Sequence, residues 1–592
     1  MWILTNIQGK GESIGDPIKK VKGFLFYGDT SQFIMFGESN PVYIYIDGFI
    51  IPRFGVYEDY KKYPQNDLIT ILYEKYGLNF IDKIKGSFNI IVFERDAIHI
   101  YNDQHSFSKF FYSDLNGKII ISSDIEGISK LRFISINKET TALFAIMEHF
   151  INGYTLFEDL YFSIPATHMK LNLNGQELHV GNYFNPLELI ENTDAKGEIT
   201  DINDMAELWS GIISGYIEYL KPRGISLTLT GGNDSRMILA ALLHNDINFT
   251  AFSFGNPESF DGVVAAEISK TLRISYDNHY VCDPTKKWFK DYAAEIINKG
   301  NSLINIHRAH RLNAIATEKE RHPDTDMLFC GFMGGDYVKG LIYDDYITPR
   351  ILRKYEGDPK KSKLRGIIIE ELNRCKINPD NIYLEKLEGI ISDLPMMNHD
   401  SRKIREFLVL FHLIGSMHDM QDTTIFKHKV KYVINPFMDV DFMQFLFGSD
   451  FSFLKNNNDF LWQTLRWNRS RFHLQITDYL ATELSKIKYA KKGHYNANEY
   501  INDNTFLLMV KRFIRKNSDK KYPQNFPYGN WIKEFCQEEL FNIDGVLTEV
   551  FNIRDLLDNL SNNDGFPTTE GFWHLFTNPV NLYLNLKKFQ TK

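Results

Sequence analysis

Residues 227–236 read Leu-Thr-Leu-Thr-Gly-Gly-Asn-Asp-Ser-Arg, and Met-Ile-Leu-Ala-Ala-Leu-Leu follows at once at 237–243. An apolar run of β type ends in a Thr-Gly-Gly turn, and an apolar segment of helical periodicity follows it. This order predicts a strand, a tight loop and a helix. The two glycines allow positive φ angles that would turn backbone N–H groups beneath an anion. The helix N-terminus adds unpaired N–H groups and the positive end of its dipole.

The polar side chains of this loop suit a phosphate with its metal. Ser235 can donate to a phosphate oxygen, and Asp234 is placed to hold a Mg²⁺ that bridges phosphates. It is not a Walker loop, since G-x-x-x-x-G-K-[ST] occurs nowhere in the chain. The stretch resembles the pyrophosphate loop of the ATP pyrophosphatases, Ser-Gly-Gly-x-Asp-Ser, with Thr230 in place of the first Ser. That resemblance implies cleavage of ATP between its α- and β-phosphates and activation of a carboxylate or amide oxygen as an adenylate. The alternative is an ordinary turn at the start of a helix.

Composition limits the class of protein. A chain of 592 residues predicts two or more domains, and 43% hydrophobic with 24% charged residues is typical of soluble globular proteins. A net charge of −8 and a pI near 6.1 argue against nucleic acid as a partner. Because the sequence has no membrane-length apolar run, no signal-peptide pattern and four cysteines without metal or redox spacing, we expect a cytoplasmic protein with reduced, mostly buried thiols and no membrane partner.

The first half, residues 1–190, alternates short β-type runs with turns, which predicts stacked sheets with few helices. Helices are expected at 67–76 and around 140–149. The expected strands are 23–27, 42–46, 87–93, 97–101 and 118–123.

An ordered set of segments in this half resembles the N-terminal glutaminase domain of asparagine-synthetase-type enzymes, which belongs to the N-terminal-nucleophile class. That glutaminase needs Cys at position 2, freed by removal of Met1, so that its own α-amine activates the thiol. Here position 2 is Trp2, and no cysteine precedes Cys282. We therefore expect a degenerate domain without glutaminase chemistry, serving as a scaffold, with docking of a peptide or partner as the alternative. The segments are 72–77, 84–89, 93–96, 102–106, 110–113 and 122–125.

A polar linker at 185–201 separates this half from a second predicted domain, residues 200–592. Helices are expected at 205–220 and 261–272, and further strands at 249–255, 278–281 and 327–330. Alternating strands and helices predict a parallel sheet, with the nucleotide at the carboxyl ends of its strands. The predicted fold is thus an α+β domain of the Ntn-hydrolase type, followed by an α/β domain of the adenine nucleotide alpha hydrolase (PP-loop) type.

The resemblance extends to two segments that follow the predicted strands. Phe252-Ser253-Phe254-Gly255 resembles the family's second strand, whose backbone and small residues receive adenine; the alternative is an ordinary buried strand. Residues 330–337, Cys-Gly-Phe-Met-Gly-Gly-Asp-Tyr, resemble Ser-Gly-x-Gly-x-Asp-Glu with one extra residue. Asp336 would then be a second Mg²⁺ carboxylate opposite Asp234 and take part in catalysis, since two acidic groups suit a metal that neutralises the leaving pyrophosphate.

Two later segments complete the resemblance. Asn-Pro-Phe-Met-Asp at 435–439 resembles the Arg-x-Pro-Phe-Leu-Asp that closes the far wall of the family's site. The run Lys-Ile-Lys-Tyr-Ala-Lys-Lys-Gly at 486–493 resembles the family's lysine segment, which reaches the α-phosphate. Lys492 is the predicted catalytic lysine, with Lys491 and Lys488 as alternatives in register; a solvated basic run is the structural alternative. Arg236 could read a substrate carboxylate or lie on the helix surface.

These expectations combine into an ATP- and Mg²⁺-dependent, AMP-forming amide ligase of the asparagine synthetase type that does not use glutamine. Its partner would be a small molecule or peptide with a carboxylate and an amine, as for a lasso-peptide macrolactam cyclase or a β-lactam synthetase. Ammonia-dependent asparagine synthesis and a non-catalytic nucleotide-binding scaffold are the alternatives, and the sequence does not define the oligomeric state. The predicted cofactor-binding residues are Leu229, Thr230, Gly231, Gly232, Asp234, Ser235, Ser253, Phe254, Gly255 and Gly334.

Overall fold

The fold is taken from a computed structural model of the chain. The structure describes residues 1–7, 15–37, 41–191, 199, 201–281, 285–340, 362–413, 418–454, 471–490, 496–502, 510–511, 514, 522–526, 528–562 and 570–590.

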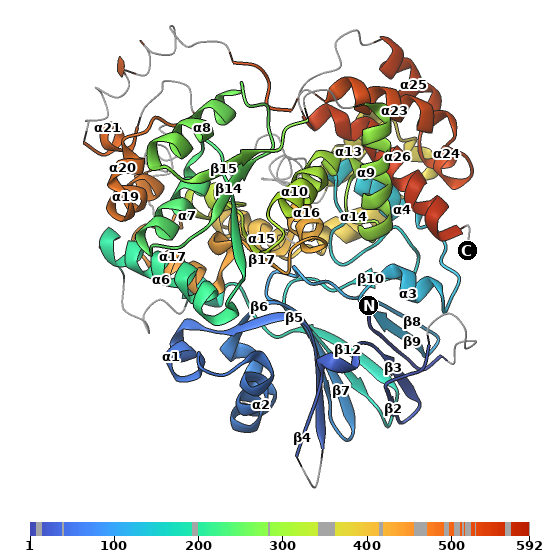
Figure 1. The fold of residues 1–592 in the computed structure, drawn as a ribbon. Coiled ribbons are helices and arrows are strands. Elements are labelled where there is room, and N and C mark those ends of the chain that lie inside the picture. Colours follow the sequence, from blue (N-terminus) through green and yellow to red (C-terminus); the bar gives the residue numbers. More distant parts are fainter. Residues whose placement is uncertain are drawn as a thin grey trace.

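The first half folds into two six-stranded antiparallel sheets, which form the lower part of the molecule in Figure 1. One sheet has the strand order β10-β8-β9-β1-β3-β2, and the other has the order β12-β11-β7-β6-β5-β4. The strands are β1 (Ile3–Thr5), β2 (Lys19–Val21), β3 (Phe24–Tyr27), β4 (Phe33–Phe36), β5 (Val42–Pro52), β6 (Ile84–Phe93), β7 (Ala97–Asn102), β8 (Phe111–Leu115), β9 (Lys118–Ser122), β10 (Tyr161–Phe162), β11 (Thr167–Asn172) and β12 (Glu177–Asn182).

Apolar side chains from both sheets form one buried core between them, which confirms the predicted stacked sheets. Trp2 belongs to this core: it is 1% exposed, and its indole Nε1 donates to Asp47 Oδ2 at 3.1 Å. The outer face of the β5–β6 sheet is covered by helix α2 (Gln65–Tyr76), through Leu68, Ile69 and Leu72. The five expected strands lie within one to three residues of observed ones at most ends, and β5 extends six residues further, to Pro52.

The second half contains a five-stranded parallel sheet of order β15-β14-β13-β16-β17, which confirms the predicted parallel sheet. The expected strand at 278–281 is observed three residues earlier. Alternate residues along a strand enter different cores: Met327 and Phe329 pack on one face, and Leu328 packs on the other. The strands are β13 (Gly224–Thr228), β14 (Thr250–Ser253), β15 (Ser275–Asn278), β16 (Thr325–Phe329) and β17 (Tyr432–Ile434).

Helices cover both faces of this sheet, and a layer of C-terminal helices, red in Figure 1, stands beside them. The helices not yet given are α1 (Tyr57–Tyr60), α3 (Ile125–Ser129), α4 (Lys138–Met147), α5 (Glu188–Glu191), α6 (Ile202–Leu220), α7 (Asn233–His244), α8 (Phe260–Leu272), α9 (Lys286–Lys299), α10 (Ala309–Arg321), α11 (Gly334–Lys339), α13 (Ser362–Arg374), α14 (Leu384–Ser392), α15 (Arg402–Leu413), α16 (His418–Lys427), α17 (Val440–Gly448), α19 (Arg471–Leu480), α20 (Thr482–Ser485), α21 (Ala497–Asn502), α23 (Gly529–Phe541), α24 (Val546–Val550), α25 (Ile553–Asn562) and α26 (Glu570–Gln590).

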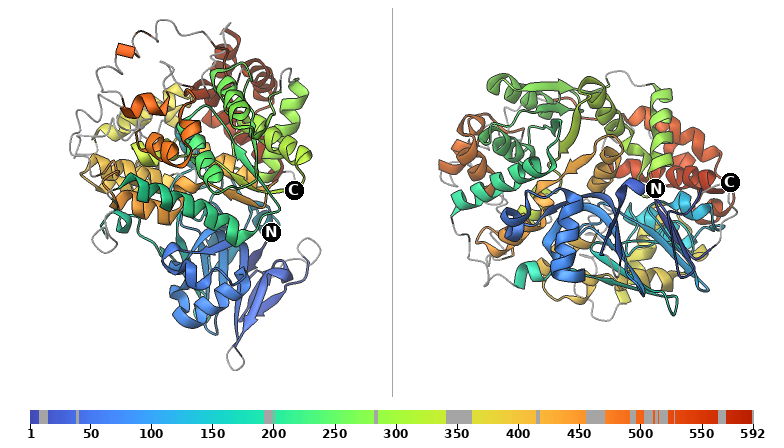
Figure 2. Two further views of the ribbon diagram at one scale, coloured as in Figure 1. Left: turned by 60° about the vertical axis from the view of Figure 1, so that its left-hand side comes forward. Right: turned by 60° about the horizontal axis from the view of Figure 1, so that its bottom comes forward.

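The two halves meet through a buried ion-pair network, at the level where Figure 2 shows the sandwich joining the helical part. Lys85 Nζ of β6 lies 2.6 Å from Asp439 Oδ2 and 2.9 Å from Asp441 Oδ2. Arg53 Nε lies 2.9 Å from Asp441 Oδ1. Asp439 also caps α17 and accepts a hydrogen bond from Tyr216. The Asn-Pro-Phe-Met-Asp segment therefore fastens the sandwich to the parallel sheet.

None of the helices in the described part of the chain is long and apolar enough to cross a membrane. The thiols of Cys330, Cys375 and Cys536 are buried, as expected, and Cys282 lies outside the described residues. The domain boundary at the predicted linker and the cytoplasmic location remain predictions.

Candidate active site

The loop at 229–232 joins β13 to α7 at the carboxyl edge of the parallel sheet, as the strand, loop and helix pattern predicts. Its hydroxyl groups hold it in a closed turn. The backbone N–H of Thr230 donates to Ser235 Oγ at 3.2 Å, and the Gly232 N–H donates to Thr230 Oγ1 at 3.2 Å. The two hydroxyls lie 3.1 Å apart, so both residues shape the loop before any ligand arrives.

Gly231 is needed for space, and the expectation of positive φ angles at the two glycines was wrong. Neither Gly231 nor Gly232 is among the residues with positive φ. A Cβ at Gly231 would instead overlap Ala490 Cβ and lie 3.0 Å from Val264 Cβ. The loop backbone is thus wedged between α8 and the segment that ends at Ala490, where only glycine fits.

The N-terminus of α7 begins at a residue without a capping side chain. Its cap residue Gly232 provides no side-chain hydrogen bond, so the first-turn N–H groups have no side-chain cap. The N–H of Gly231 donates to Asp261 Oδ1 at 3.2 Å. A carboxylate of the chain itself therefore accepts one of the loop N–H groups in this structure.

Asp234 lies in the first turn of α7, facing the loop after β16. Its Oδ1 is 3.0 Å from Nε2 of His473, a fully buried side chain of α19, while its own side chain is 33% exposed. A Cβ at Gly334 would lie 2.9 Å from Asp234 Cγ, and one at Gly331 would lie 3.0 Å from the Ser235 nitrogen. The structure therefore brings the 331–334 turn directly against Asp234.

Asp336 is 5% exposed and lies in the first turn of α11, two residues after Gly334. Met333 precedes this helix in the left-handed conformation, at φ 62°, and its carbonyl accepts from the Asp336 N–H at 3.1 Å. The extra residue of this segment is therefore accommodated by a tight turn. The two residues follow the neighbouring strands β13 and β16, and the binding of Mg²⁺ by their carboxylates remains a prediction.

The lysine segment is fixed to the loop by Arg236, which is buried at 0% exposure and neither lies on the helix surface nor faces open solvent. Its guanidinium donates to the carbonyl of Ile487 at 2.8 Å and to that of Lys488 at 2.5 Å, and lies 3.9 Å from the ring centroid of Tyr489. The Ala490 N–H then donates to Gly231 O at 3.0 Å.

The exposed Lys488 therefore belongs to a segment that reaches the loop. Lys491 and Lys492 lie outside the described residues, so the structure leaves the register of the predicted catalytic lysine untested.

The predicted adenine segment borders the loop and contacts a distant part of the chain. Ser253 Oγ donates to Leu229 O, which ties β14 to the loop. Phe254 stacks on Phe526 with centroids 5.9 Å apart, and a Cβ at Gly255 would overlap Asn525 Oδ1. Residues 525–526 therefore lie on this edge, a contact that no local pattern indicates.

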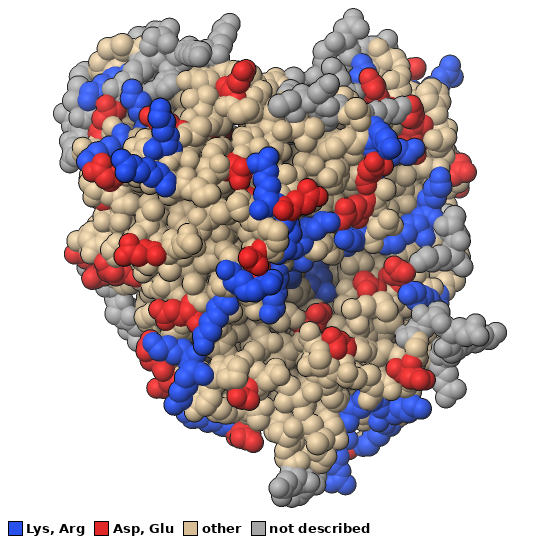
Figure 3. All heavy atoms as spheres, viewed as in Figure 1, with Lys and Arg blue, Asp and Glu red and all other residues tan. Residues whose placement is uncertain are grey.

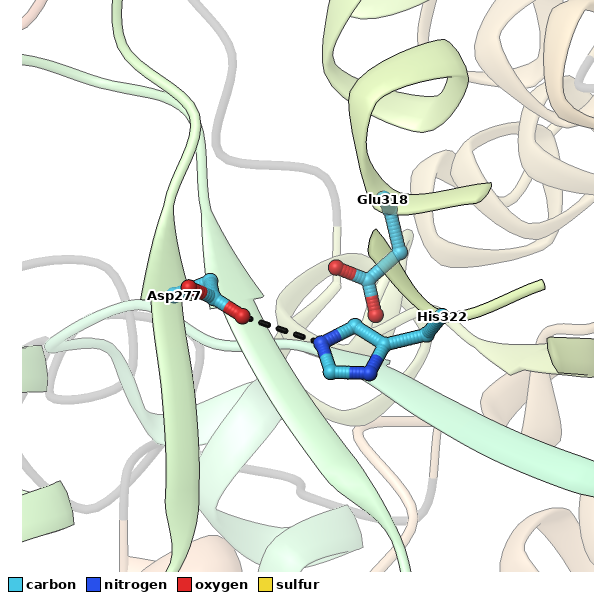
Figure 4. A group of neighbouring side chains, drawn as sticks. All are labelled: Asp277, Glu318 and His322. Atoms are coloured by element: carbon cyan, nitrogen blue, oxygen red, sulfur yellow. Dashed lines mark hydrogen bonds and ion pairs between the residues drawn. The ribbon is translucent and has the colours of Figure 1, made fainter. Parts of the chain in front are cut away.

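Two polar clusters near the sheet were missed by sequence reasoning. Figure 4 shows Asp277, Glu318 and His322, whose possible ligand atoms lie within 4.8 Å of one another. Glu318 Oε1 accepts from Ser226 and Thr250, and Oε2 lies 2.7 Å from His279 Nε2, so this cluster braces three strands against α10.

The second cluster places Arg308 and Arg311 around the fully buried carboxylate of Asp422. Arg311 also lies 5.9 Å from the ring centroid of Phe254. A buried arginine therefore borders the predicted adenine segment. These clusters join residues far apart in the sequence, so spacing alone gave no signal.

Comparisons with known proteins add little. No protein-family model and no curated protein matches the chain. Two similar solved structures are titled an allosteric regulatory enzyme of purine biosynthesis and glutamine phosphoribosylpyrophosphate amidotransferase from B. subtilis complexed with ADP and GMP. The match to the first covers 37% of this chain and 44% of the other chain, so this chain spans under half of that protein's length. The match to the second covers 64% of this chain and 78% of the other chain. Both are 8% identical with TM-scores of 0.19, and at these values neither similarity supports an inference about this chain.

Proposed function

We propose that the protein is an ATP-dependent, AMP-forming amide ligase of the asparagine synthetase type. The observation that carries this proposal is the convergence of three segments at one sheet edge. The turn at 331–334 and the segment ending at Ala490 each contact the loop at 229–235 there. The edge is formed by the carboxyl ends of parallel strands, where α/β folds bind nucleotides.

Each segment has a distinct part in the proposed reaction. The loop N–H groups, Thr230 and Ser235 bind the pyrophosphate portion of ATP. Asp234 and Asp336 would hold Mg²⁺, which neutralises charge on the departing pyrophosphate. The carboxylate oxygen of the substrate attacks the α-phosphorus and pyrophosphate leaves. An amine then attacks the acyl carbon, loses a proton and displaces AMP.

The lysine segment supplies positive charge to that transition state. Arg236 positions the segment by binding the carbonyls of Ile487 and Lys488. The described chain therefore ends beside the loop, at Ala490, just before Lys491 and Lys492 in the sequence. Lys492 is the proposed residue, with Lys491 and Lys488 as alternatives. A fixed cation aimed at developing phosphate charge is an effective electrostatic catalyst, because it needs no reorganisation during the reaction.

The nitrogen donor is proposed to be a substrate amine or free ammonia. The resembling family has its cysteine nucleophile at position 2, where this sequence has Trp2, which is 1% exposed in the sandwich core. Residues 1–281 contain no cysteine and therefore offer no thiol for the glutaminase chemistry of that family, which is why we propose a nitrogen donor other than glutamine.

The proposal is tested by measuring AMP and pyrophosphate released from ATP with Mg²⁺. The candidates are aspartate, glutamine, ammonia and any precursor peptide encoded beside the gene. Release that requires the peptide indicates a macrolactam or peptide amide ligase, and release with aspartate and ammonia indicates asparagine synthesis. Asp234→Ala should abolish release, whereas Asp59→Ala, an exposed change in α1, should leave it unchanged. ATP bound without turnover under every condition would favour the non-catalytic scaffold.

A further inference from the structure

A separate cavity of about 250 Å³ lies where the sandwich meets the helices of the second half. Its walls come from β5, β6, the loop before β8, the end of α9 and α16. Figure 3 shows lysine and arginine side chains gathered in the middle of this face, above the sandwich. The volume is below the ~300–1,000 Å³ of sites for drug-sized ligands, so the cavity suits a small molecule. Its polar lining includes Asp47, Asn89, Lys109, Lys299, Gln421 and Lys427.

Lys427 brings a buried ammonium group to this cavity. Its Nζ donates to Ser87 Oγ at 2.7 Å, Ser108 Oγ at 2.8 Å and Phe107 O at 3.1 Å. These three acceptors are neutral and fix the position of the ammonium group, while the nearby carboxylates of Asp103 and Asp47 offset part of its charge. Burial lowers the pKa of Lys427, which shows the cost of keeping this charge away from water.

Lys109 places a second ammonium group in the same wall. Its Nζ donates to Ser106 O at 2.6 Å, and burial lowers its pKa to about 7, despite the opposing effect of Asp103. The other charged or titratable groups around it are Asp47, Lys299, Lys427 and His428. Burial lowers the pKa of His428 to about 4, so this imidazole is neutral near pH 7.

Two buried amides in the lining have atoms without partners. Among the described residues, neither Gln421 Nε2 nor Asn89 Oδ1 has a hydrogen bond. Gln421 is 3% exposed, and its Oε1 accepts from the Asn305 N–H at 2.9 Å, which sets the direction of its amide. A buried donor without a partner is costly, unless a ligand or water satisfies it.

We propose that this cavity binds a small anion, a carboxylate or a phosphate, through Lys109, Lys427 and the amide of Gln421. Two ammonium groups and an unsatisfied N–H donor converge on a space of the right size. Because the three N–H groups of Lys427 already donate to Ser87, Ser108 and Phe107, this side chain would attract the anion by its charge, while the unsatisfied Gln421 Nε2 can donate a hydrogen bond to it. The inference does not rest on the proposed ligase activity, because the cavity uses none of the residues of the nucleotide loop.

The first test measures the thermal midpoint of the full-length protein against succinate and against inorganic phosphate, at constant ionic strength. A saturable rise in the thermal midpoint is expected with at least one of the two anions. The anion that gives the rise shows whether the cavity binds a carboxylate or a phosphate. Lys427→Met should weaken that response about tenfold or more. Ser235→Ala, in the nucleotide loop, should keep it. No rise with either anion, or an equal rise in Lys427→Met, would overturn the proposal.

Dependence on pH gives a second readout. Affinity for the anion should fall as the pH rises through about 7, because Lys109 then loses its proton. An affinity that stays constant across this pH range would show that Lys109 does not contribute to binding the anion.

Gln421→Glu keeps the shape of the side chain and places a carboxylate beside the lysines. We expect this variant to be more thermostable than wild type and to lose its response to the anion, because the new charge replaces the ligand. Gln176→Glu, on an exposed turn, is the matched control and should behave as wild type. A loss of stability in Gln421→Glu with the anion response retained would contradict the proposal.

Discussion

Arg236 shows how much one residue can depend on contacts distant in sequence. A helix-surface position and a role in reading substrate were both open from the sequence. The structure buries its side chain, whose guanidinium fastens residues 487–489 to the start of α7, beside the loop at 229–232. The partners lie about 250 residues away, so helical periodicity could not reveal them.

Replacing this arginine should release the lysine segment. In Arg236→Met the carbonyls of Ile487 and Lys488 lose charged donors, so the chain should detach from the loop. We expect trypsin to cut after Lys488 faster than in wild type, as followed by mass spectrometry. Arg223→Met, at a side chain that is 67% exposed, is the control. Equal cutting in wild type and Arg236→Met would show that the arginine does not hold the segment.

The pKa of Glu318 predicts how the stability of the fold changes with pH in the acid range. Burial alone would raise its pKa, but hydrogen bonds from His279, Ser226 and Thr250 lower the pKa below its usual 4.5. A carboxyl whose folded pKa is depressed stabilises the fold above its unfolded pKa, and that contribution is lost as the pH falls through the folded value.

Glu318→Gln should therefore be less stable than wild type by about 1–3 kcal/mol at neutral pH, and the difference should shrink as the pH falls below about 4.5. Thermal unfolding across the acid range measures it. Glu320→Gln, exposed on the same helix, should show no such trend. A difference that is constant with pH would mean that the charge of Glu318 has no part in the brace.

At the scale of elements, local patterns were sufficient for the strands and helices that flank the loop. Apolar runs and helical spacing predicted β13, α7, β14 and α8 to within a few residues. The expectation for β15 was displaced because its residues Ser275–Asn278 are mostly polar, whereas the apolar residues follow them. The glycine pair was located correctly. Glycine is required at position 231 because of close packing against Ala490, a tertiary contact that the turn pattern does not encode.

Gly231→Ala tests that reason. The added methyl group would overlap Ala490, so we expect destabilisation of about 1–3 kcal/mol and loss of ATP-dependent activity. Gly211→Ala in α6 is the opposite case, since nothing lies within 4 Å of its new Cβ. There the lower entropy of the unfolded chain should raise stability by about 0.5–1 kcal/mol. Equal effects of the two changes on the thermal midpoint would contradict the packing of the loop.

At the scale of the whole molecule, the sequence indicated two sheet systems but not how they join. Lys85, Arg53, Asp439 and Asp441 come from segments more than 350 residues apart, so their network is visible only in the fold. The family resemblance located Asp439 at the wall of the site. Its partners show that the same segment also carries the junction between the halves.

Lys85→Met should weaken that junction strongly. Removal of the ammonium group leaves Asp439 and Asp441 buried without their main counter-charge, which costs about 3–5 kcal/mol. Urea unfolding should show the loss, and Lys62→Met, at an exposed position in the sandwich, should have little effect. A Lys85→Met protein as stable as wild type would show that the network is not needed to join the halves.

The central claim is that the loop at the carboxyl edge of the parallel sheet binds ATP through its pyrophosphate portion. Its most direct test is calorimetric titration of the full-length protein with the magnesium complex of α,β-methylene-ATP. This analogue cannot be split between its α- and β-phosphates, and the test does not require the substrate to be known. We predict saturable binding to wild type, competition by inorganic pyrophosphate, and affinity lowered about tenfold or more in Asp234→Ala. Absence of binding to wild type, or equal affinity in the variant, would contradict the claim.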